Sequence, residues 1–273
     1  NVALGFCALE GNTTGSRNAA SGSLALDSNT TADDNTATGY KALYANTTGH
    51  SNVAVGCGAL AANTTGICLV AIGKGALNAN TTANNNTAIG NNVLFDNTEG
   101  FSNVAIGAYA GQNVTTGDCN VLVGNDAGEN ITTGNNNIAL GRGAGTDAVS
   151  NVVASSNNIV IGNNSSSTAK IKIDWTVTSD LRDKTEIESV PHGLNFVNQI
   201  TPIKYRFKTS RENDTPNGVT RYGFKAQEIL ALEGKNPVLV NNEDTDNLKL
   251  TGAYLVPVLV NAIKELKARI EVL

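Results

Sequence analysis

A segment of the form Asn-x-Ala-x-Gly recurs along the first half of the chain with an unvarying step of 17 residues. A short fixed period predicts stacked coils, each of which contacts mainly its two neighbours. A tenth segment closes after an insertion of four residues, so the repeat extends over residues 1–162. The closing glycines are Gly5, Gly22, Gly39, Gly56, Gly73, Gly90, Gly107, Gly124, Gly141 and Gly162.

Each coil is predicted to consist of a strand, a turn, a short second segment and a second turn. The Asn-x-Ala-x-Gly segment alternates and carries many β-branched residues at its second and fourth places, which is typical of a strand. The Asn-Thr-Thr-Gly segments at Asn12, Asn46 and Asn63 predict turns, because Asn tolerates the left-handed conformation and Gly supplies positive φ. The same Asn-x-Thr triplets match glycosylation acceptors, but turn chemistry explains them without glycans.

Two rows of alanine, at the third and eighth positions of the repeat, indicate close packing at two sites in every coil. Each coil adds only about three larger aliphatic residues, and aromatic residues make up 5% of the chain. One coil of this size buries little apolar surface alone. We therefore expect coils from several chains to share one core.

A compensating exchange divides the repeats into two groups. The first six carry Leu at the ninth position and Asn at the twelfth, whereas the last three carry Gly at the ninth. The Asn is then replaced by Val114, Ile131 and Ala148, so the aliphatic group moves three places along the coil. Close packing favours such compensation. We expect two segments of different cross-section that meet near Asn103.

The four cysteines (Cys7, Cys57, Cys68 and Cys119) lie in the repeat and form no CxxC pair. Cys68 and Cys119 share a phase but lie three coils apart, roughly 14 Å at the spacing of neighbouring strands, which is beyond the reach of a disulfide. With only two histidines in the chain, a zinc site is not expected, and we predict no metal and no cofactor.

Beyond a polar linker the composition becomes that of a small α+β domain. The linker and a strand at Lys170–Val177 occupy residues 163–178, and the α+β domain is residues 179–273. Within it we predict a helix over 190–200, a strand over 202–208 and a loop over 211–218. A strand that continues into a helix is predicted over 221–232, and a closing helix over 255–273. The closing helix has an apolar stripe at Leu259, Ala262, Leu266 and Leu273. This stripe suits either association with the same helix of other chains or packing onto its own domain.

Both halves resemble parts of fibrous surface proteins. The repeat resembles the head repeats of trimeric autotransporter adhesins and related shafts of phage tail fibres. The ordered set SDLRDK, PIKYRFK, YGFKAQE and LVPVLVNAIKELKARI, from Ser179 to the C-terminus, resembles the C-terminal intramolecular chaperone domain of phage tailspikes, tail fibres and endosialidases. These resemblances imply a mainly β fold: a trimeric β-roll or β-solenoid shaft followed by a chaperone domain.

The chaperone resemblance also implies a Ser-Lys dyad at the domain junction. Ser179 would be the nucleophile that attacks the carbonyl of Thr178, and Lys184 would be the general base, with Asp180 and Arg182 in supporting positions. The cut would fall between Thr178 and Ser179, once per chain, as a single-turnover self-cleaving serine peptidase. The alternative is that Ser179 caps the first turn of the next segment and Lys184 is a solvated surface lysine.

The function implied is that of a phage tail-fibre or tailspike piece in the virion tail, with host attachment as its context. A net charge of −5 argues against a nucleic-acid partner, and no apolar run is long enough to span a membrane. The expected partners are two further copies in a homotrimer and a host surface glycan or receptor. The alternatives are a bacterial cell-surface trimeric adhesin and a tailspike that binds or hydrolyses glycans.

Overall fold

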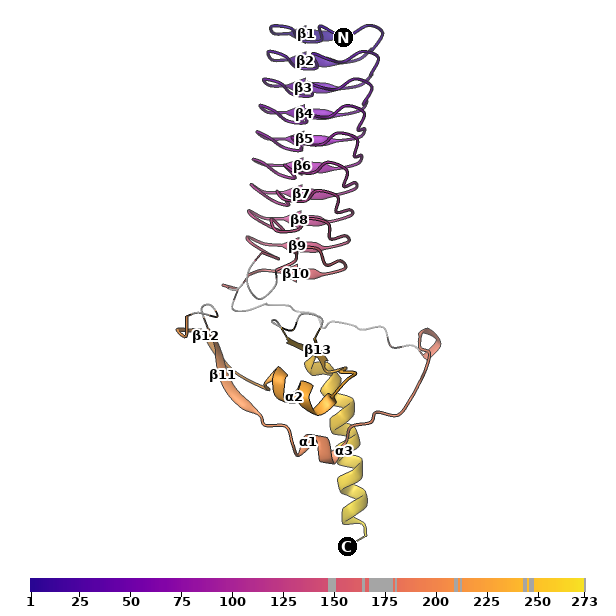
Figure 1. Ribbon diagram of the computed structural model, residues 1–273, viewed down its shortest axis with the longest axis vertical. Coiled ribbons are helices and arrows are strands. Elements are labelled where there is room, and N and C mark those ends of the chain that lie inside the picture. Colours follow the sequence, from indigo (N-terminus) through magenta and orange to yellow (C-terminus); the bar gives the residue numbers. More distant parts are fainter. Residues whose placement is uncertain are drawn as a thin grey trace. The chain divides into compact units, whose positions relative to one another are not determined.

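The computed structural model describes residues 1–146, 151–163, 165–166, 179, 181–208, 211, 213–242, 245 and 248–272. They fall into two compact units, Asn1–Ser166 and Ser167–Leu273 (Figure 1). No helix in the described ranges is long and apolar enough to cross a membrane.

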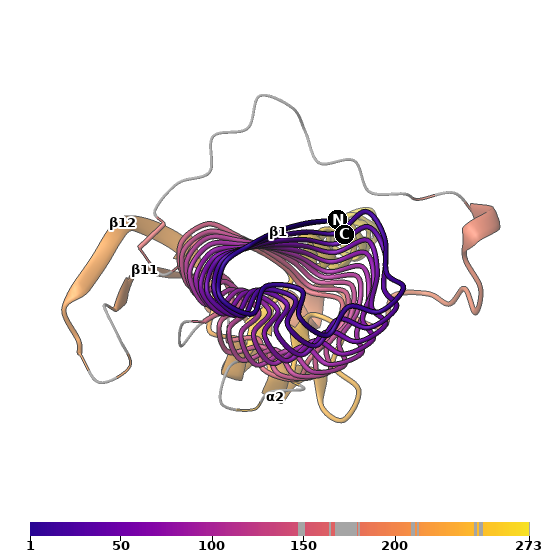
Figure 2. The same ribbon diagram turned by 90° about the horizontal axis from the view of Figure 1, so that it is seen from above.

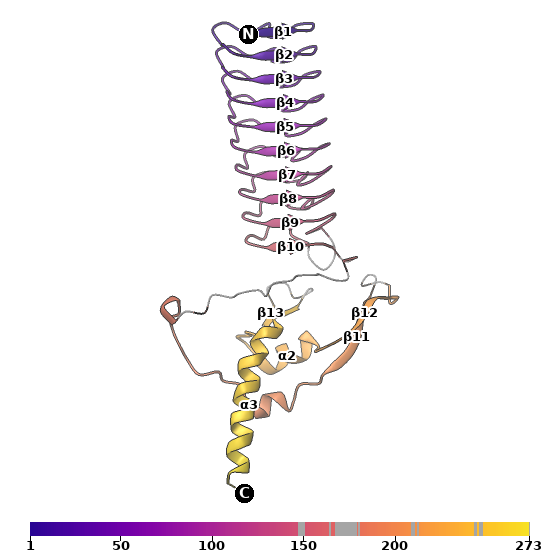
Figure 3. The same ribbon diagram turned by 180° about the vertical axis from the view of Figure 1, so that it is seen from behind.

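The first unit is a parallel β-solenoid, in which one three-residue strand of each coil pairs with the strand of the next coil (Figures 1 and 3). Successive strands pair with an offset of 17 residues, and β9 pairs with β10 with an offset of 21. Figure 2, which looks along the stack, shows the coils lying one over another. The predicted period, strand and insertion are confirmed. The strands are β1 (Val2–Leu4), β2 (Ala19–Ser21), β3 (Thr36–Thr38), β4 (Val53–Val55), β5 (Val70–Ile72), β6 (Thr87–Ile89), β7 (Val104–Ile106), β8 (Val121–Val123), β9 (Ile138–Leu140) and β10 (Ile159–Ile161).

The glycine that closes each strand is required by the stacking itself. Gly5 has a φ of +141°, and a Cβ on it would lie 2.5 Å from the carbonyl oxygen of Gly22 in the next coil. The same approach recurs at each closing glycine down to Gly124. A side chain there would force adjacent coils apart, which explains why this position does not vary.

The core of the solenoid lies inside a single chain. The middle strand residue of the inner coils points inward and is essentially inaccessible to solvent. So are the alanine or valine at the eighth position and, in the coils up to Leu94, the leucine at the ninth. The expectation that several chains must share this core is therefore wrong. Each coil buries its apolar groups against the coils on either side of it, so a coil does not have to enclose a core alone.

Asparagine amides complete this core by forming two ladders along the stack. In one ladder Asn29 donates from Nδ2 to Oδ1 of Asn12 (2.8 Å), and the pattern continues coil by coil to Asn97. In the other, the Asn that precedes a strand accepts a backbone N–H from the next coil, as Asn18 does from Asn35 (2.9 Å), with one interruption at Leu69. Except for Oδ1 of Asn97 at the end of the first ladder, the side-chain oxygens and nitrogens of these buried amides find partners in neighbouring coils or in their own turn, as is usual for buried polar groups.

The Asn-Thr-Thr-Gly segments are turns, but not for the predicted reason. Asn12 and Gly15 do not have positive φ; the left-handed residues lie elsewhere, for example at Arg17 and Leu9. The asparagine is needed for the ladder, where it is buried in all coils from Asn29 to Asn97. A buried, hydrogen-bonded amide is not accessible to a glycosyltransferase in the folded shaft, so the ladder explains these asparagines without glycans.

The exchange between the two groups of repeats is confirmed, with one correction. Val114 and Ile131 are fully buried beside the glycines of their coils. In the ninth coil the corresponding residue is Val152, whose N–H donates to the carbonyl of Gly145 (2.8 Å) just as Val114 donates to Gly111. Ala148, the predicted residue, lies outside the described residues.

The second unit is a small α+β domain whose core gathers side chains from three helices and a short sheet. Its buried residues are Phe196, Ile229, Leu239, Val240, Leu255 and Val258. The elements are η1 (Leu181–Asp183), α1 (Leu194–Val197), β11 (Ile203–Lys208), β12 (Pro216–Gly223), α2 (Ala226–Glu233), β13 (Val240–Asn241), β14 (Lys249–Leu250), η2 (Gly252–Tyr254) and α3 (Leu255–Ile270). The predicted strand, the strand-to-helix segment and the closing helix are confirmed. The helix predicted over 190–200 is only one turn, and the strand predicted at Lys170–Val177 lies outside the described residues.

Helix α3 uses only part of its apolar surface within the domain. Leu255, Val258 and Ala262 are buried, and Glu265 accepts a hydrogen bond from the N–H of Leu194 (2.8 Å) at the start of α1. Other apolar side chains of the helix remain more than a third exposed: Val256, Leu259, Val260, Ile263, Leu266 and Ile270. The helix therefore packs onto its own domain and still presents an unpaired apolar surface.

Candidate functional site

The candidate site is a short turn at the start of the second unit. Residues Leu181–Asp183 form a single 3-10 turn, η1, which is closed by the N–H of Lys184 donating to the carbonyl of Leu181 (3.2 Å). A 3-10 turn advances about 2 Å per residue and reverses the chain within a few residues. The turn therefore returns Lys184 to the neighbourhood of Ser179, five residues earlier.

Ser179 and Lys184 are in direct contact. The Nζ of Lys184 lies 2.8 Å from Oγ of Ser179 and 3.0 Å from the carbonyl oxygen of the same serine. A separation of 2.8 Å is that of a hydrogen bond. With a protonated lysine, Nζ donates to Oγ; with a neutral lysine, the same separation allows the serine hydroxyl to donate to Nζ. The pair thus has the nucleophile–base geometry that proton abstraction from a serine requires.

The other residues predicted for the site are only partly described. Arg182 lies on η1, is exposed and has an interaction of its own. Thr178 and Asp180 lie outside the described residues. The structure therefore brings together two of the predicted residues, Ser179 and Lys184, and describes neither the carbonyl of Thr178 nor the carboxylate of Asp180.

The alternative interpretation of the same residues was a capping serine and a free surface lysine. Lys184 is indeed exposed, but its ammonium group contacts Ser179, and the described contact of the serine hydroxyl is with this lysine. Exposure has a chemical consequence. A lysine accepts a proton only when it is neutral, and removal from water favours the neutral form. In a single chain the two side chains are in hydrogen-bond contact but are not shielded from solvent.

The four cysteines of the shaft are free; Cys57, Cys68 and Cys119 are exposed, and Cys7 is half-buried. Cys7 lies beside Glu10 and Asp27, and the ligand atoms of the three residues are all within 4.8 Å of one another. Glu10 is the main cause that raises the pKa of the Cys7 thiol to about 11, through a hydrogen bond, and partial burial and the negative charges of Glu10 and Asp27 act in the same direction. The thiol is therefore kept protonated, which disfavours its use as a nucleophile.

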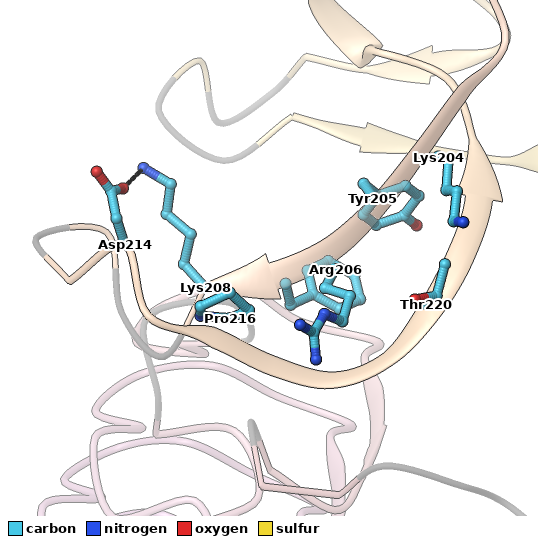
Figure 4. Close-up of a pocket in the computed structure, with 8 residues that line it drawn as sticks. Lys204, Tyr205, Arg206, Lys208, Asp214, Pro216 and Thr220 are labelled. Atoms are coloured by element: carbon cyan, nitrogen blue, oxygen red, sulfur yellow. Dashed lines mark ion pairs between the residues drawn. The ribbon is translucent and has the colours of Figure 1, made fainter.

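One feature of the second unit was not predicted. Strands β11 and β12 line an open hollow of about 480 Å³ with basic and aromatic side chains (Figure 4). The alternating basic residues of PIKYRFK were visible in the sequence. The position of these residues beside a break in strand pairing was not predicted, because the first residues of β12 were assigned to a loop over 211–218.

A match to a known protein family begins at this turn. Residues 179–237 match the family described as chaperone of endosialidase. The match begins at Ser179 and runs past the end of α2. Neither the search of curated proteins nor the search of solved structures found a match. The chain thus carries a chaperone-of-endosialidase domain behind a β-solenoid shaft.

Proposed function

We propose that this chain is a homotrimeric segment of a phage tail fibre or tailspike, whose C-terminal domain assembles three chains, guides folding of the shaft and then cuts itself off. The contact between Ser179 and Lys184, at the first residue of the family match, is the observation that carries the proposal. The cut falls between Thr178 and Ser179.

The proposed reaction is an intramolecular acyl transfer followed by hydrolysis. Lys184 takes the hydroxyl proton of Ser179 while Oγ attacks the carbonyl carbon of Thr178. The Thr178–Ser179 amide bond breaks, the amine of Ser179 receives the proton from Lys184, and an ester joins the two residues. Water hydrolyses this ester, which leaves a carboxylate on Thr178 and a free amine on Ser179. No co-reactant other than water is needed.

Because Ser179 and Lys184 are exposed, the proposed reaction requires that water be removed from around them. Lys184 is solvent-accessible in one chain, and removal of water from around a lysine favours the neutral form that can act as a base. Packing of three chains against the junction would remove water from it. Cleavage is therefore expected to follow assembly, so that chains that have not assembled keep their chaperone domain.

Two unpartnered apolar surfaces support the trimer. The first is the outward face of the solenoid sheet, where the fourth residue of the strand motif is more than a third exposed in coil after coil: Val55, Ile72, Ile89, Ile106 and Leu140. The second is the exposed apolar surface of α3. Contiguous apolar surface of this kind is typical of protein–protein contact sites. Identical chains would place both surfaces in symmetric contacts.

A globular domain that trimerises first also solves a folding problem for the shaft. Three repetitive chains can pair in many registers, and each whole-coil shift keeps the same local contacts. A domain that holds three chains at one end raises their local concentration and fixes a common starting point. Removal of that domain afterwards would leave the shaft kinetically trapped.

A second role, glycan binding by the shaft, is favoured by one observation. Five of the six aromatic residues in residues 1–162 lie at the sixth, seventh or tenth position of the repeat: Phe6, Tyr40, Tyr44, Phe95 and Tyr109. In the third coil the Nζ of Lys41 lies 5.5 Å and 5.1 Å from the ring centroids of Tyr40 and Tyr44. Exposed rings beside a cation would suit an acidic sugar. Loss of glycan-array binding in Tyr40→Ala, with Phe101→Ala as control, tests this role.

The main proposal is tested by the intact mass of the purified full-length chain after incubation. Wild type is expected to yield fragments that end at Thr178 and begin at Ser179, and Ser179→Ala and Lys184→Ala are expected to remain whole. Ser189→Ala and Lys235→Ala are matched controls, because they remove the same groups elsewhere in the domain. Cleavage at this bond in Ser179→Ala, or none in the wild-type trimer, would refute the proposed reaction.

A further inference from the structure

The arm formed by β11 and β12 contains a break in strand pairing. Tyr205 pairs with Arg221 and Phe207 pairs with Asn217, so the single residue Arg206 faces the three residues 218–220. Gly218 has a φ of +72°, which lets the longer strand bend outward at this point. Bulges of this kind redirect side chains and are frequent beside functional sites.

The hollow lies at this break. Figure 4 shows Lys204 and Thr220 at one end of it and Lys208 with Asp214 at the other, and Arg206 lies between them. Tyr205 and Phe207 contribute aromatic walls. The lining thus offers an ammonium group, a guanidinium group and a hydroxyl group, drawn from both strands of the arm.

The charges around the hollow are not balanced. The arm, residues 203–223, contains five basic and two acidic residues in a chain whose net charge is −5. Lys208 forms an ion pair with Asp214, and Arg221 lies over the ring of Phe207 at 5.3 Å. Within the described part of the chain, Lys204 and Arg206 take part in no salt bridge. Two uncompensated cations therefore line the hollow of an otherwise acidic protein.

We propose that this hollow is a binding site for an oxyanion of the phosphate class, held by Lys204, Arg206 and Thr220. Guanidinium groups bind phosphate in a bidentate manner, and an ammonium group acts as a point charge beside it. A phosphate has enough acceptor oxygens for all three side chains, whereas a carboxylate has only two oxygens. The site does not include Ser179 or Lys184, so anion binding and the proposed cleavage can be tested separately.

The test is calorimetric titration of the full-length chain with pyrophosphate at constant ionic strength. We expect saturable binding of one ion per chain, with affinity reduced at least tenfold in Lys204→Gln and in Arg206→Gln. Lys235→Gln removes an exposed lysine outside the arm and is expected to bind like wild type. Acetate at the same ionic strength is expected to bind much more weakly than pyrophosphate. Absence of saturable binding, or equal affinity in all variants, would overturn the site.

A second measurement does not depend on the variants folding correctly. In the unmodified chain, pyrophosphate is expected to slow amide hydrogen exchange in residues 204–208 and 217–221 selectively. Arg206→Lys keeps the charge and removes the bidentate geometry, so it is expected to bind more weakly than wild type and more tightly than Arg206→Gln. Protection confined to another part of the chain would show that the anion binds elsewhere.

Discussion

The side chain of Leu122 occupies the space that a side chain on Gly111 would need. A Cβ on Gly111 would lie 2.6 Å from Cδ1 of Leu122, and a Cβ on Gly128 would lie 2.6 Å from its Cδ2. Leu122 stands at a strand position that is alanine in the coils on either side. It thus supplies the volume that two coils lose where leucine is replaced by glycine, together with Val114 and Ile131.

Leu122→Ala is therefore expected to open a cavity between these coils. Fully buried leucines lose about 2–5 kcal/mol on truncation to alanine. Leu140→Ala, at an exposed position of the next strand, is the control and is expected to cost far less. Chemical denaturation of the two variants beside wild type measures the difference, and equal losses would contradict the packing described here.

The amide ladder predicts unequal effects of two similar substitutions. Asn46→Ala removes two donated hydrogen bonds and leaves Nδ2 of Asn63 without its acceptor on Asn46. Oδ1 of Asn97, at the end of the ladder, has no hydrogen-bond partner among the described residues. Because each buried group left unpaired costs about 1–3 kcal/mol, Asn46→Ala should destabilise the shaft more than Asn97→Ala. The reverse order in thermal unfolding would exclude a continuous ladder.

Acid is expected to weaken the contact between the first two coils. Hydrogen bonds from Ser16 lower the pKa of Asp33, and Arg17, 2.5 Å away, lowers the pKa of Asp34. The stability that these carboxylates contribute is present above their unfolded pKa of about 3.9 and is lost as pH falls through the lowered folded values. Asp33→Asn/Asp34→Asn should therefore be less stable than wild type at pH 6, and the difference should vanish in strong acid. A difference independent of pH would rule this linkage out.

Cysteine reactivity should separate Cys7 from the other three thiols. Cys57, Cys68 and Cys119 are exposed, whereas the pKa of Cys7 is raised to about 11. At pH 8 a disulfide reagent should label the exposed cysteines quickly and Cys7 slowly, since the thiolate is the reactive form. Glu10→Gln removes the main cause of the shift and should accelerate labelling of Cys7. The rates can be followed by peptide mass, and rapid labelling of Cys7 in wild type would contradict the assignment.

Assembly and cleavage should fail together when the exposed surface of α3 is charged. Ile263 is 66% exposed in a single chain, so Ile263→Glu should leave the domain folded. If α3 joins three chains, the variant should be monomeric by light scattering and cleaved at least tenfold more slowly. Lys264→Glu changes charge at the neighbouring residue and serves as control. A monomeric variant that cleaves at the wild-type rate would uncouple the Ser179–Lys184 reaction from assembly.

The sequence predicted the shaft well because its signals repeat. The 17-residue step, the strand motif and the closing glycine appear so often that a single irregular coil, such as the one with Leu69 in place of asparagine, does not obscure them. The interior of the coil was predicted less well. The six leucines at the ninth position of the repeat, from Leu9 to Leu94, adopt positive φ, which local preference disfavours and which only the stacked neighbours impose. The volume filled by buried amides was also overlooked, which led to the incorrect expectation of a core shared between chains.

The sequence allowed us to predict which residues form the pair at the junction, but not how they come into contact. A serine and a lysine five residues apart are close in few local conformations, and it is the turn η1 that brings Lys184 to Ser179. Family resemblance drew attention to the two residues, whereas their spacing alone favoured an ordinary cap and a surface lysine. The hollow at Arg206 could not be predicted, since a three-against-one bulge has no clear signal in the sequence.

The exact 17-residue repeat also makes most coils interchangeable, and this has a consequence for assembly from identical chains. A chain displaced by one whole coil would make nearly the same contacts with its neighbours, so uniform coils do not specify the register between chains. The irregular coils carry that information: Leu69, the change of packing between Asn97 and Val114, and the insertion before Val152 each occur once. If identical chains assemble as proposed, these irregular coils distinguish one register from the next, and without them the chains would have no coil-specific contacts to keep their ends at the same level.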